Sequence, residues 1–453
     1  MLHKIILENY KSFGTRGEIS LYPNPKRTFY TNHIYSGEDL LYPVLKHCLI
    51  VGPNASGKTN LVKAMKFLKD FCCGKQHHDP KEEWLSHWYY DNRFNLPIAE
   101  DEAPIHYMIE FSKGGKYYEY SVCFDGEGIK TESLYLVRGN RLRPQVIFLR
   151  CRDKVEFSKE ITATNENTSS FSQQMENNPE TSILVLNANF RYVENENVIN
   201  AQTWFRDNLE VSYEDMTMPN LMDIYCKTPR IMQFTNTILK KIGIGCTVAI
   251  AESKPSDWLR KNSCTIDRSI LNLFEGGEIS PSIHSYDAAD MIIRRTGNRK
   301  VIREMEFIHT GANGYELRTK ASEESSGTIH LLTVLVLLYQ CIYNGKSYII
   351  DGLDLNINAA TFRDLLKYYC ETESNGQIIY TANTLMTMNQ QEMTRLDEVN
   401  LLEKKDGSSK ILALDKLPNI KTLLSLERNY LDGRFGGRPG VISVESLDGD
   451  KMK

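Results

Sequence analysis

The eight residues Gly52-Pro-Asn-Ala-Ser-Gly-Lys-Thr59 decide the fold of this 453-residue chain. They match the pattern G-x-x-x-x-G-K-[ST], in which backbone N–H groups of a glycine-rich loop surround the phosphates of a nucleotide. A β-like run, Val44 to Val51, precedes the loop, and an amphipathic helical pattern follows from Thr59. Strand, loop and helix together predict a phosphate-binding loop and disfavour the alternative, a glycine-rich turn with a solvated lysine.

The loop gives each of its polar side chains a chemical role. In such a loop the Lys58 ammonium reaches the β- and γ-phosphates, and the Thr59 hydroxyl binds Mg²⁺. The helix N-terminus adds a partial positive charge that favours the β-phosphate. The candidate nucleotide-binding residues of this loop are Gly52, Asn54, Ala55, Ser56, Gly57, Lys58, Thr59 and Asn60.

A second candidate anion site precedes the most apolar helical segment, Ile329 to Ile342. Small hydroxyl residues and a glycine at a helix N-terminus offer side-chain and backbone donors to a γ-phosphate. By itself this short pattern favours an ordinary serine-capped helix, and only the upstream loop makes it a nucleotide-site candidate. The four residues are Ser325, Ser326, Gly327 and Thr328.

An acidic residue follows the next apolar strand pattern. Ser347 to Ile350 predicts a buried strand, and Asp351 comes directly after it. This is the expected place for the carboxylate that holds Mg²⁺, so Thr59 and Asp351 are the two candidate metal-site residues. The alternative for Asp351 is a carboxylate that caps the following turn.

Composition restricts the class of protein. Hydrophobic residues make up 41% and charged residues 25%, with a formal net charge of −4, so the chain lacks the basic excess of a dedicated nucleic-acid binder. The longest apolar run, Leu331 to Tyr343, is shorter than a bilayer requires. Glu8 and Lys11 interrupt the region where a secretion signal needs an apolar core. We therefore expect a cytoplasmic protein that does not contact a membrane.

The pattern of elements predicts an α/β fold with three segments. Alternating runs between Ile105 and Phe157 predict an antiparallel meander, and the polar stretch from Thr162 to Asn178 predicts a mobile loop or lid. We expect a first half of the domain at 1–194, a helical insertion at 195–304 and a second half at 305–453.

Both ends of the chain resemble the ABC/SMC-fold, RecF-like ATPases of the AAA-15 or AbiLi type, which occur in bacterial abortive-infection and phage-defence systems. This resemblance implies an ABC-type P-loop head with a mixed sheet, an antiparallel β subdomain and an inserted helical subdomain. It also implies ATP and Mg²⁺ as ligands. The segments that carry it are Glu8 to Phe13, Gly52 to Asn60, Glu324 to Thr328, Asp351 to Asn358, Thr381 to Thr384, Arg395 to Glu398 and Tyr430 to Gly436.

The chain departs from this family at three positions on the catalytic side. Where the family has a glutamate that polarises the attacking water, Gly352 follows Asp351. Asn358 and Asn383 stand where the family has histidines. Asp354 and Asn383 are the remaining catalytic candidates, and neither reproduces a base aimed at the γ-phosphate. We expect a chain that binds ATP with Mg²⁺ and hydrolyses it slowly or not at all.

Three functions follow as hypotheses. The first is a nucleotide-gated sensor or scaffold: ATP joins two copies head to tail and, by resemblance, controls a toxic effector such as a nuclease. The second is an active RecF- or SMC-like ATPase that clamps or repairs DNA, for which the basic residues between Arg294 and Arg303 are the candidates. The alternative is that those residues form a solvent-exposed charged surface with no binding role. The third is a pseudoenzyme with a vestigial site.

Overall fold

The computed structural model divides the chain into two compact units. The first comprises Met1–Tyr213, Cys341–Asp354 and Arg363–Lys453, and the second comprises Glu214–Gln340 and Leu355–Phe362. The structure describes residues 1–37, 40–75, 84–95, 103–137, 144–164, 171, 174–175, 178–191, 193–212, 216–261, 291–296, 299–382, 394–417 and 426–435.

A six-stranded sheet in the first unit carries the phosphate-binding loop. Its strand order is β11-β16-β17-β5-β18-β19, and all its neighbouring strands are parallel except β18 and β19. The central strands are short and fully buried, as expected where both faces of a parallel sheet are covered. The strands are β5 (His47–Val51), β11 (Leu209–Ser212), β16 (Ser347–Ile350), β17 (Gln377–Ala382), β18 (Val399–Lys405) and β19 (Ser408–Ala413).

A seven-stranded antiparallel sheet forms the second layer of the first unit, in the order β10-β9-β8-β7-β6-β1-β2. It confirms the predicted meander, because β6 to β10 pair in sequence order. Its strands are β1 (Leu2–Glu8), β2 (Gly17–Ser20), β6 (Ile105–Lys113), β7 (Lys116–Asp125), β8 (Gly128–Val137), β9 (Gln145–Cys151) and β10 (Lys154–Phe157). The short strands β3 (Ile34–Tyr35) and β4 (Val44–Leu45) pair separately.

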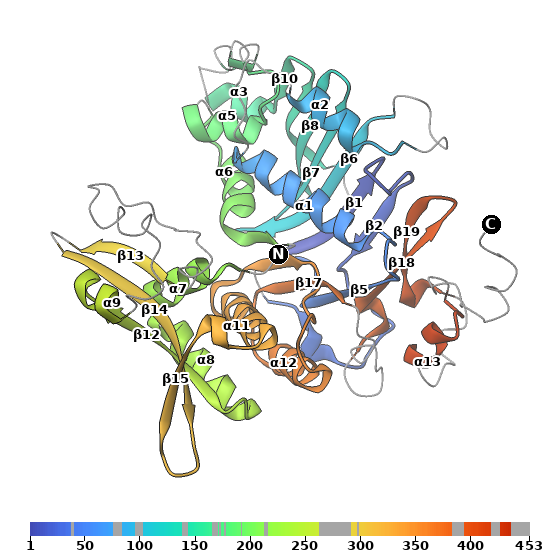
Figure 1. The fold of residues 1–453 in the computed structure, drawn as a ribbon. Helices are drawn as coiled ribbons and strands as arrows, with labels where there is room; N and C mark the ends of the chain where they lie inside the picture. Colours follow the sequence, from blue (N-terminus) through green and yellow to red (C-terminus); the bar gives the residue numbers. More distant parts are fainter. Residues whose placement is uncertain are drawn as a thin grey trace, which may run out of the picture. The chain divides into compact units, whose positions relative to one another are not determined.

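Helix α1 (Lys58–Cys73) shares one hydrophobic core with both sheets. Figure 1 shows it beside the strands of the antiparallel sheet. Its buried face includes Leu61, Met65 and Leu68. Gly74 caps the C-terminus of the helix, and its φ of +63° is the left-handed conformation that favours glycine. The sequence predicted this helix and its apolar stripe correctly.

The remaining elements of the first unit surround these sheets. They are η1 (Thr31–His33), α2 (Trp84–Asn92), α3 (Lys159–Thr164), α5 (Ile183–Phe190), α6 (Glu196–Thr203), η2 (Trp204–Asn208), η5 (Leu396–Glu398), η6 (Leu414–Lys416) and α13 (Leu426–Leu431), together with most of α12 (Ala359–Glu371).

The mobile loop predicted for Thr162 to Asn178 is wrong where the structure describes it. Its first residues belong to α3, and the side chains of Phe171 and Met175 are fully buried in the core. Burial of these two apolar side chains holds Phe171 and Met175 in the core. The rest of the stretch lies largely outside the described residues.

The second unit combines helices with a four-stranded antiparallel sheet. Strand β14 (Arg299–Thr310) pairs with β12 (Cys246–Ser253), β13 (Met291–Thr296) and β15 (Glu316–Lys320). The helical elements are α7 (Met218–Lys227), α8 (Pro229–Ile242), α9 (Pro255–Lys261), η3 (Ala321–Glu323) and the first part of α11 (Ser326–Asn344). The segment 195–304, predicted as helical, thus also contains strands, whose Ile- and Val-rich runs alternate with charged residues. The boundaries 1–194, 195–304 and 305–453 stay a prediction, since the compact units combine distant parts of the chain.

Within the described residues, α11 is the one helix whose length and composition would suit a membrane span. Its most apolar window has a mean hydropathy of 1.5, and 67% of that window is buried inside the protein. Core helices of water-soluble domains meet the same criteria, so this feature does not indicate insertion into a bilayer.

Candidate nucleotide-binding site

The glycines of the loop are required by close contacts around it. A Cβ atom on Gly52 would lie 2.5 Å from the backbone carbonyl oxygen of Leu402. Gly57 has a φ of +110°, and a Cβ atom there would lie 2.5 Å from Oγ of Ser409. Because any larger residue would clash or be strained, the loop pattern reflects a specific backbone shape.

Two serines outside the loop hold it in place. The hydroxyl of Ser409 donates to the carbonyl oxygen of Ser56 at 2.6 Å, and the Asn60 side chain donates to Oγ of Ser12 at 2.9 Å. The backbone N–H of Ser409 donates to the carbonyl of Ser12 at 2.6 Å. Sequence reasoning missed Ser409, because a serine at the start of a hairpin strand carries no pattern.

Lys58 folds back over the loop from the start of α1. Its Nζ atom donates to the carbonyl oxygens of Gly52 at 2.6 Å and Pro53 at 3.2 Å. Burial lowers the pKa of Lys58, while the carboxylates of Asp351 and Asp354 act to raise it. The ammonium is thus held at the loop beside two acids.

The two candidate metal-site residues lie in contact. The Thr59 hydroxyl donates to Oδ2 of Asp351 at 2.6 Å. The second carboxylate oxygen, Oδ1, accepts from the Thr381 hydroxyl at 2.5 Å, and the Thr381 hydroxyl accepts from the backbone N–H of Gly352 at 2.8 Å. A hydroxyl and a carboxylate are hard oxygen ligands, so these two residues suit a Mg²⁺ ion that keeps several waters.

The positions expected to catalyse hydrolysis offer no clear general base within the described residues. Gly352 has a φ of +67° and carries no side chain, so the position of the family's glutamate offers no base. Asn358 caps α12, because its Oδ1 accepts from the N–H groups of Ala360 at 3.0 Å and Thr361 at 3.4 Å. Asp354 lies close enough to Lys58 to affect its pKa. Asn383 lies outside the described residues.

The serine-rich segment before α11 has the geometry of a capped helix. Oγ of Ser325 accepts from the N–H of Thr328 at 3.1 Å, and the two hydroxyls lie 2.9 Å apart. A Cβ atom on Gly327 would lie 2.4 Å from the carbonyl oxygen of Asn356, so a backbone passes directly over this glycine. Ser326 is exposed. The segment belongs to the second unit, whereas the phosphate-binding loop belongs to the first.

The basic residues between Arg294 and Arg303 lie on two paired strands of the second unit. Arg295 is opposite Lys300 and Thr296 is opposite Arg299 in the β13–β14 register. Arg303 forms an ion pair with Glu252 on β12, with Nη2 2.6 Å from Oε1. This arginine is therefore neutralised within the protein.

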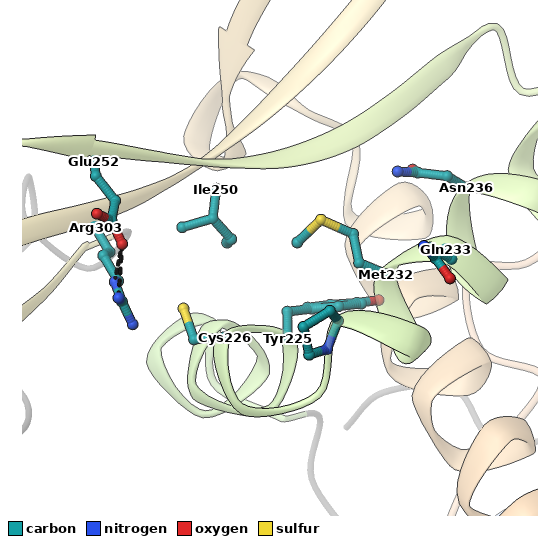
Figure 2. Close-up of a pocket in the computed structure, with 9 residues that line it drawn as sticks. Tyr225, Cys226, Met232, Gln233, Asn236, Ile250, Glu252 and Arg303 are labelled. Carbon is teal, nitrogen blue, oxygen red and sulfur yellow. Dashed lines mark hydrogen bonds and ion pairs between the residues drawn. The ribbon is translucent and has the colours of Figure 1, made fainter.

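A separate pocket of 470 Å³ lies in the second unit. Figure 2 shows the helix that carries Tyr225 and Cys226 on one side and the strand that carries Ile250 and Glu252 on the other. The lining is mostly apolar, with the Glu252–Arg303 ion pair at one end. The complete lining is Tyr225, Cys226, Pro229, Met232, Gln233, Asn236, Ile250, Glu252 and Arg303.

The buried parallel strand, the glycine-rich loop and the adjacent Thr59–Asp351 contact define a P-loop nucleotide-binding domain. A family model described as "AAA domain, putative AbiEii toxin, Type IV TA system" matches residues 49–381. That match covers most of the chain, and the chain belongs to this family. By family it is an AAA-type ATPase domain. This agrees with the broad class of protein, an ATPase domain, that the resemblance in the sequence implied.

Solved structures of SMC head domains are similar to this chain. The SMC head domain from Thermotoga maritima has 16% identity and a TM-score of 0.38, over 91% of this chain and 98% of that one. An SmcHead bound to the C-winged helix domain of ScpA has 14% identity and a TM-score of 0.44, over 95% of this chain and 99% of that one. A third structure is the Smc head domain with an extended coiled coil bound to the C-terminal domain of ScpA, derived from Pyrococcus furiosus. It has 13% identity and a TM-score of 0.40, over 92% of this chain and 97% of that one.

None of the curated proteins compared with the chain matches it. The predicted α/β class with a mixed sheet and an antiparallel β layer is confirmed by the strand pairing, whereas the ABC/SMC type of the head stays a prediction.

Proposed function

We propose that the chain binds ATP together with Mg²⁺ at the loop Gly52 to Thr59. The observation that carries this proposal is the contact between Thr59 and Asp351, whose oxygens lie 2.6 Å apart at the ends of two different elements. Lys58 supplies the cation for the phosphates, and the loop amides and the N-terminus of α1 supply further donors. In this role Mg²⁺ neutralises phosphate charge and orients the triphosphate.

Hydrolysis at this site is slow in our proposal. The carboxylate that orients an attacking water is missing at Gly352, and Asn358 is engaged as the cap of α12. A general base is worth about 10²–10⁴ in rate, so its loss leaves binding intact while turnover falls by a similar factor. Nucleotide binding then acts as a switch, since binding energy can favour one conformation without a chemical step.

Calorimetry with the purified chain, MgCl₂ and ATP tests the binding step. We expect saturable uptake, and about 10- to 150-fold weaker uptake for Lys58→Ala, from the roughly 1.5–3 kcal/mol of a charged hydrogen bond. Lys63→Ala is the matched control, because Lys63 lies on the exposed face of the same helix. A folded chain that takes up no nucleoside triphosphate would overturn the proposal.

Steady-state phosphate release tests the proposal that the chain hydrolyses ATP slowly. We expect a rate at least about 100-fold below the typical enzyme turnover of about 10 s⁻¹. Release at ordinary ATPase rates that Lys58→Ala abolishes would contradict slow hydrolysis while leaving the binding proposal in place.

We further propose that ATP binding controls assembly of this chain with a second copy and with a toxic effector in the cytoplasm. The support is the resemblance to abortive-infection ATPases and a family description that names a toxin and a toxin–antitoxin system. The donors of Ser325 to Thr328 would then contact the γ-phosphate bound by another copy. An ATP-dependent increase in sedimentation mass is the expected result, and a mass that ATP leaves unchanged counts against a nucleotide-gated assembly.

DNA clamping is the second candidate. The β13–β14 pairing brings Arg294, Arg295, Arg299 and Lys300 to adjacent strands, and Arg295 and Lys300, which lie directly opposite each other, are the pair that supports a phosphate contact. Arg303 is already paired with Glu252, which reduces the available charge. Neutralising the four other residues should remove salt-dependent DNA binding if this candidate is correct.

A further inference from the structure

A buried cluster of metal-ligand residues lies at the opposite end of β5 from the phosphate-binding loop. His33, His47 and Cys370 place one potential ligand atom each within 4.8 Å of one another. All three residues are at most 3% exposed. His47 is the first residue of β5, so the cluster lies about 13 Å along the strand from the end that leads into the loop.

Glu398 holds both imidazoles from one side. Its Oε1 lies 2.9 Å from Nδ1 of His33, and its Oε2 lies 3.2 Å from Nε2 of His47. Oε2 also accepts from the backbone N–H of Arg395 at 2.9 Å. A carboxylate that binds one nitrogen of a histidine ring leaves the other nitrogen for a cation, which is the usual arrangement around metal-bound histidines.

The Nδ1 nitrogen of His47 is buried and, like Nε2, makes no hydrogen bond of good geometry to the described residues, although Nε2 lies 3.2 Å from Oε2 of Glu398 and the ring interacts with the Cys370 thiol. A buried polar nitrogen without a partner costs free energy, and a bound cation would satisfy it. This atom therefore points to a ligand independently of the clustering.

Cys370 is fixed in position by the end of its helix. Nζ of Lys46 donates to the carbonyl oxygens of Cys370 at 3.1 Å and Thr372 at 3.0 Å, which satisfies the last turn of α12. The thiol is fully buried, and its Sγ atom lies within 4.8 Å of a ring nitrogen of each histidine. Thiolate is the form that binds metals.

We propose that His33, His47 and Cys370 bind a zinc ion, with the Glu398 carboxylate positioning the two imidazoles. Imidazole nitrogen and thiolate sulfur are the ligands that zinc prefers in proteins. Two neutral imidazoles, one thiolate and one carboxylate carry a charge of −2, which a divalent ion balances in the interior. Without a metal ion, the negative charges of the carboxylate and the thiolate stay buried without a counter-charge unless the two histidines are protonated.

The zinc ion links parts of the first unit that are distant in sequence. His33 ends η1 and His47 begins β5, whereas Cys370 lies in the last turn of α12 and Glu398 directly precedes β18. An ion at this point joins the N-terminal elements to the C-terminal strands on either side of β5. Because binding free energy at such a site is folding free energy, the ion stabilises the strand that carries the nucleotide loop.

Metal content and Co²⁺ spectroscopy of the untagged, nucleotide-free chain test this proposal. We expect about one zinc per purified chain. After chelation, Co²⁺ should give visible absorption of a tetrahedral ion and a near-ultraviolet sulfur-to-cobalt band, both removed by added Zn²⁺. A Co²⁺ ion at Thr59 and Asp351 has oxygen ligands only, so it cannot produce the sulfur band.

Cys370→Ser should lose the sulfur-to-cobalt band, while the matched variant Cys341→Ser, which alters another fully buried thiol, should keep it. Glu398→Gln should weaken zinc binding about 10- to 100-fold without abolishing the band. A wild-type chain that neither contains zinc nor gives the band with Co²⁺ overturns the proposal. A sulfur-to-cobalt band that persists unchanged in Cys370→Ser also overturns it. These readouts need no nucleotide and are independent of the proposed function.

Discussion

Thr59 and Asp351 share a hydrogen bond of 2.6 Å although 292 positions separate them in the chain. Thr59 lies in the first turn of α1, and Asp351 directly follows β16. Strands β5 and β16 are both parallel to β17, which lies between them, so their carboxyl ends meet at one edge of the sheet. This edge is where open α/β sheets bind ligands, and the contact places both magnesium candidates there.

Replacing Asp351 with asparagine should remove the Mg²⁺ dependence of ATP binding. Asn keeps one oxygen that can accept from Thr381 or Thr59, but it loses the charge that attracts the ion. We expect ATP affinity in Mg²⁺ to fall about 10- to 150-fold, to the level measured in EDTA. Calorimetry in both buffers measures this.

Asp364→Asn is the control for that experiment, because the Asp364 carboxylate is exposed and pairs with its neighbour Arg363. It should leave Mg²⁺ dependence unchanged. Equal Mg²⁺ dependence in wild type and Asp351→Asn would mean that Asp351 is a turn-capping residue and not part of a metal site.

Gly57→Ala should disrupt the loop through the backbone. The residue has a φ of +110°, and an added Cβ atom would lie 2.5 Å from Oγ of Ser409 and 2.9 Å from Oγ of Ser12. We expect a loss of stability of at least about 1 kcal/mol and loss of nucleotide binding, measured by urea unfolding and calorimetry.

Gly311→Ala controls for the loss of a glycine as such. Gly311 lacks a positive φ, and the nearest atom to its Cβ position is 3.6 Å away, so this variant should be neutral or slightly stabilising. If Gly57→Ala proves as stable and as tightly binding as Gly311→Ala, the loop does not require its left-handed glycine.

The sequence was sufficient for the parts of the site that local patterns specify. The loop motif predicted α1 and its glycine-rich start, and the apolar run before Asp351 predicted β16. Alternation of apolar and polar residues predicted the antiparallel meander. In each case the signal is a periodic pattern or a motif contained in a short window.

Contacts between distant segments could not be predicted in this way. Ser409 supports the loop from a hairpin strand, and Thr381 holds the Asp351 carboxylate from β17, but isolated hydroxyl residues carry no periodic signal. The cluster of His33, His47 and Cys370 is likewise invisible in the sequence, because its ligands lack the short spacing that identifies metal motifs. The burial of Phe171 within a polar stretch depends on tertiary packing alone.

Arg395→Met should destabilise the first unit strongly. Arg395 and Asp397 form a buried two-point ion pair, with Nε 3.0 Å from Oδ1 and Nη2 2.7 Å from Oδ2. Arg395 also donates to the carbonyl oxygen of Phe29 at 2.6 Å, and Asp397 accepts from the N–H of Asn24 at 2.6 Å. Removing one partner leaves the other charge buried, which costs about 3–5 kcal/mol.

Urea unfolding measures this loss, with Arg363→Met as the control. Arg363 pairs with Asp364 on the surface, and such pairs contribute about 0–1 kcal/mol. Similar unfolding midpoints for the two variants would show that the buried pair contributes no more than an exposed one.

Ser326→Trp should block ATP-dependent assembly while preserving the fold. The Ser326 side chain is exposed at the start of α11, and the helix is capped by Ser325, so a large residue at 326 meets solvent within one chain. In a head-to-tail pair, however, the same side chain would occupy the space that the partner's phosphates need. We expect sedimentation mass to rise with ATP and Mg²⁺ for wild type and to stay monomeric for this variant. Ser322→Trp, a nearby exposed position outside the helix start, should assemble as wild type does. The same nucleotide-dependent mass increase in Ser326→Trp would show that the start of α11 takes no part in the assembly, even if the loop at Lys58 binds ATP normally.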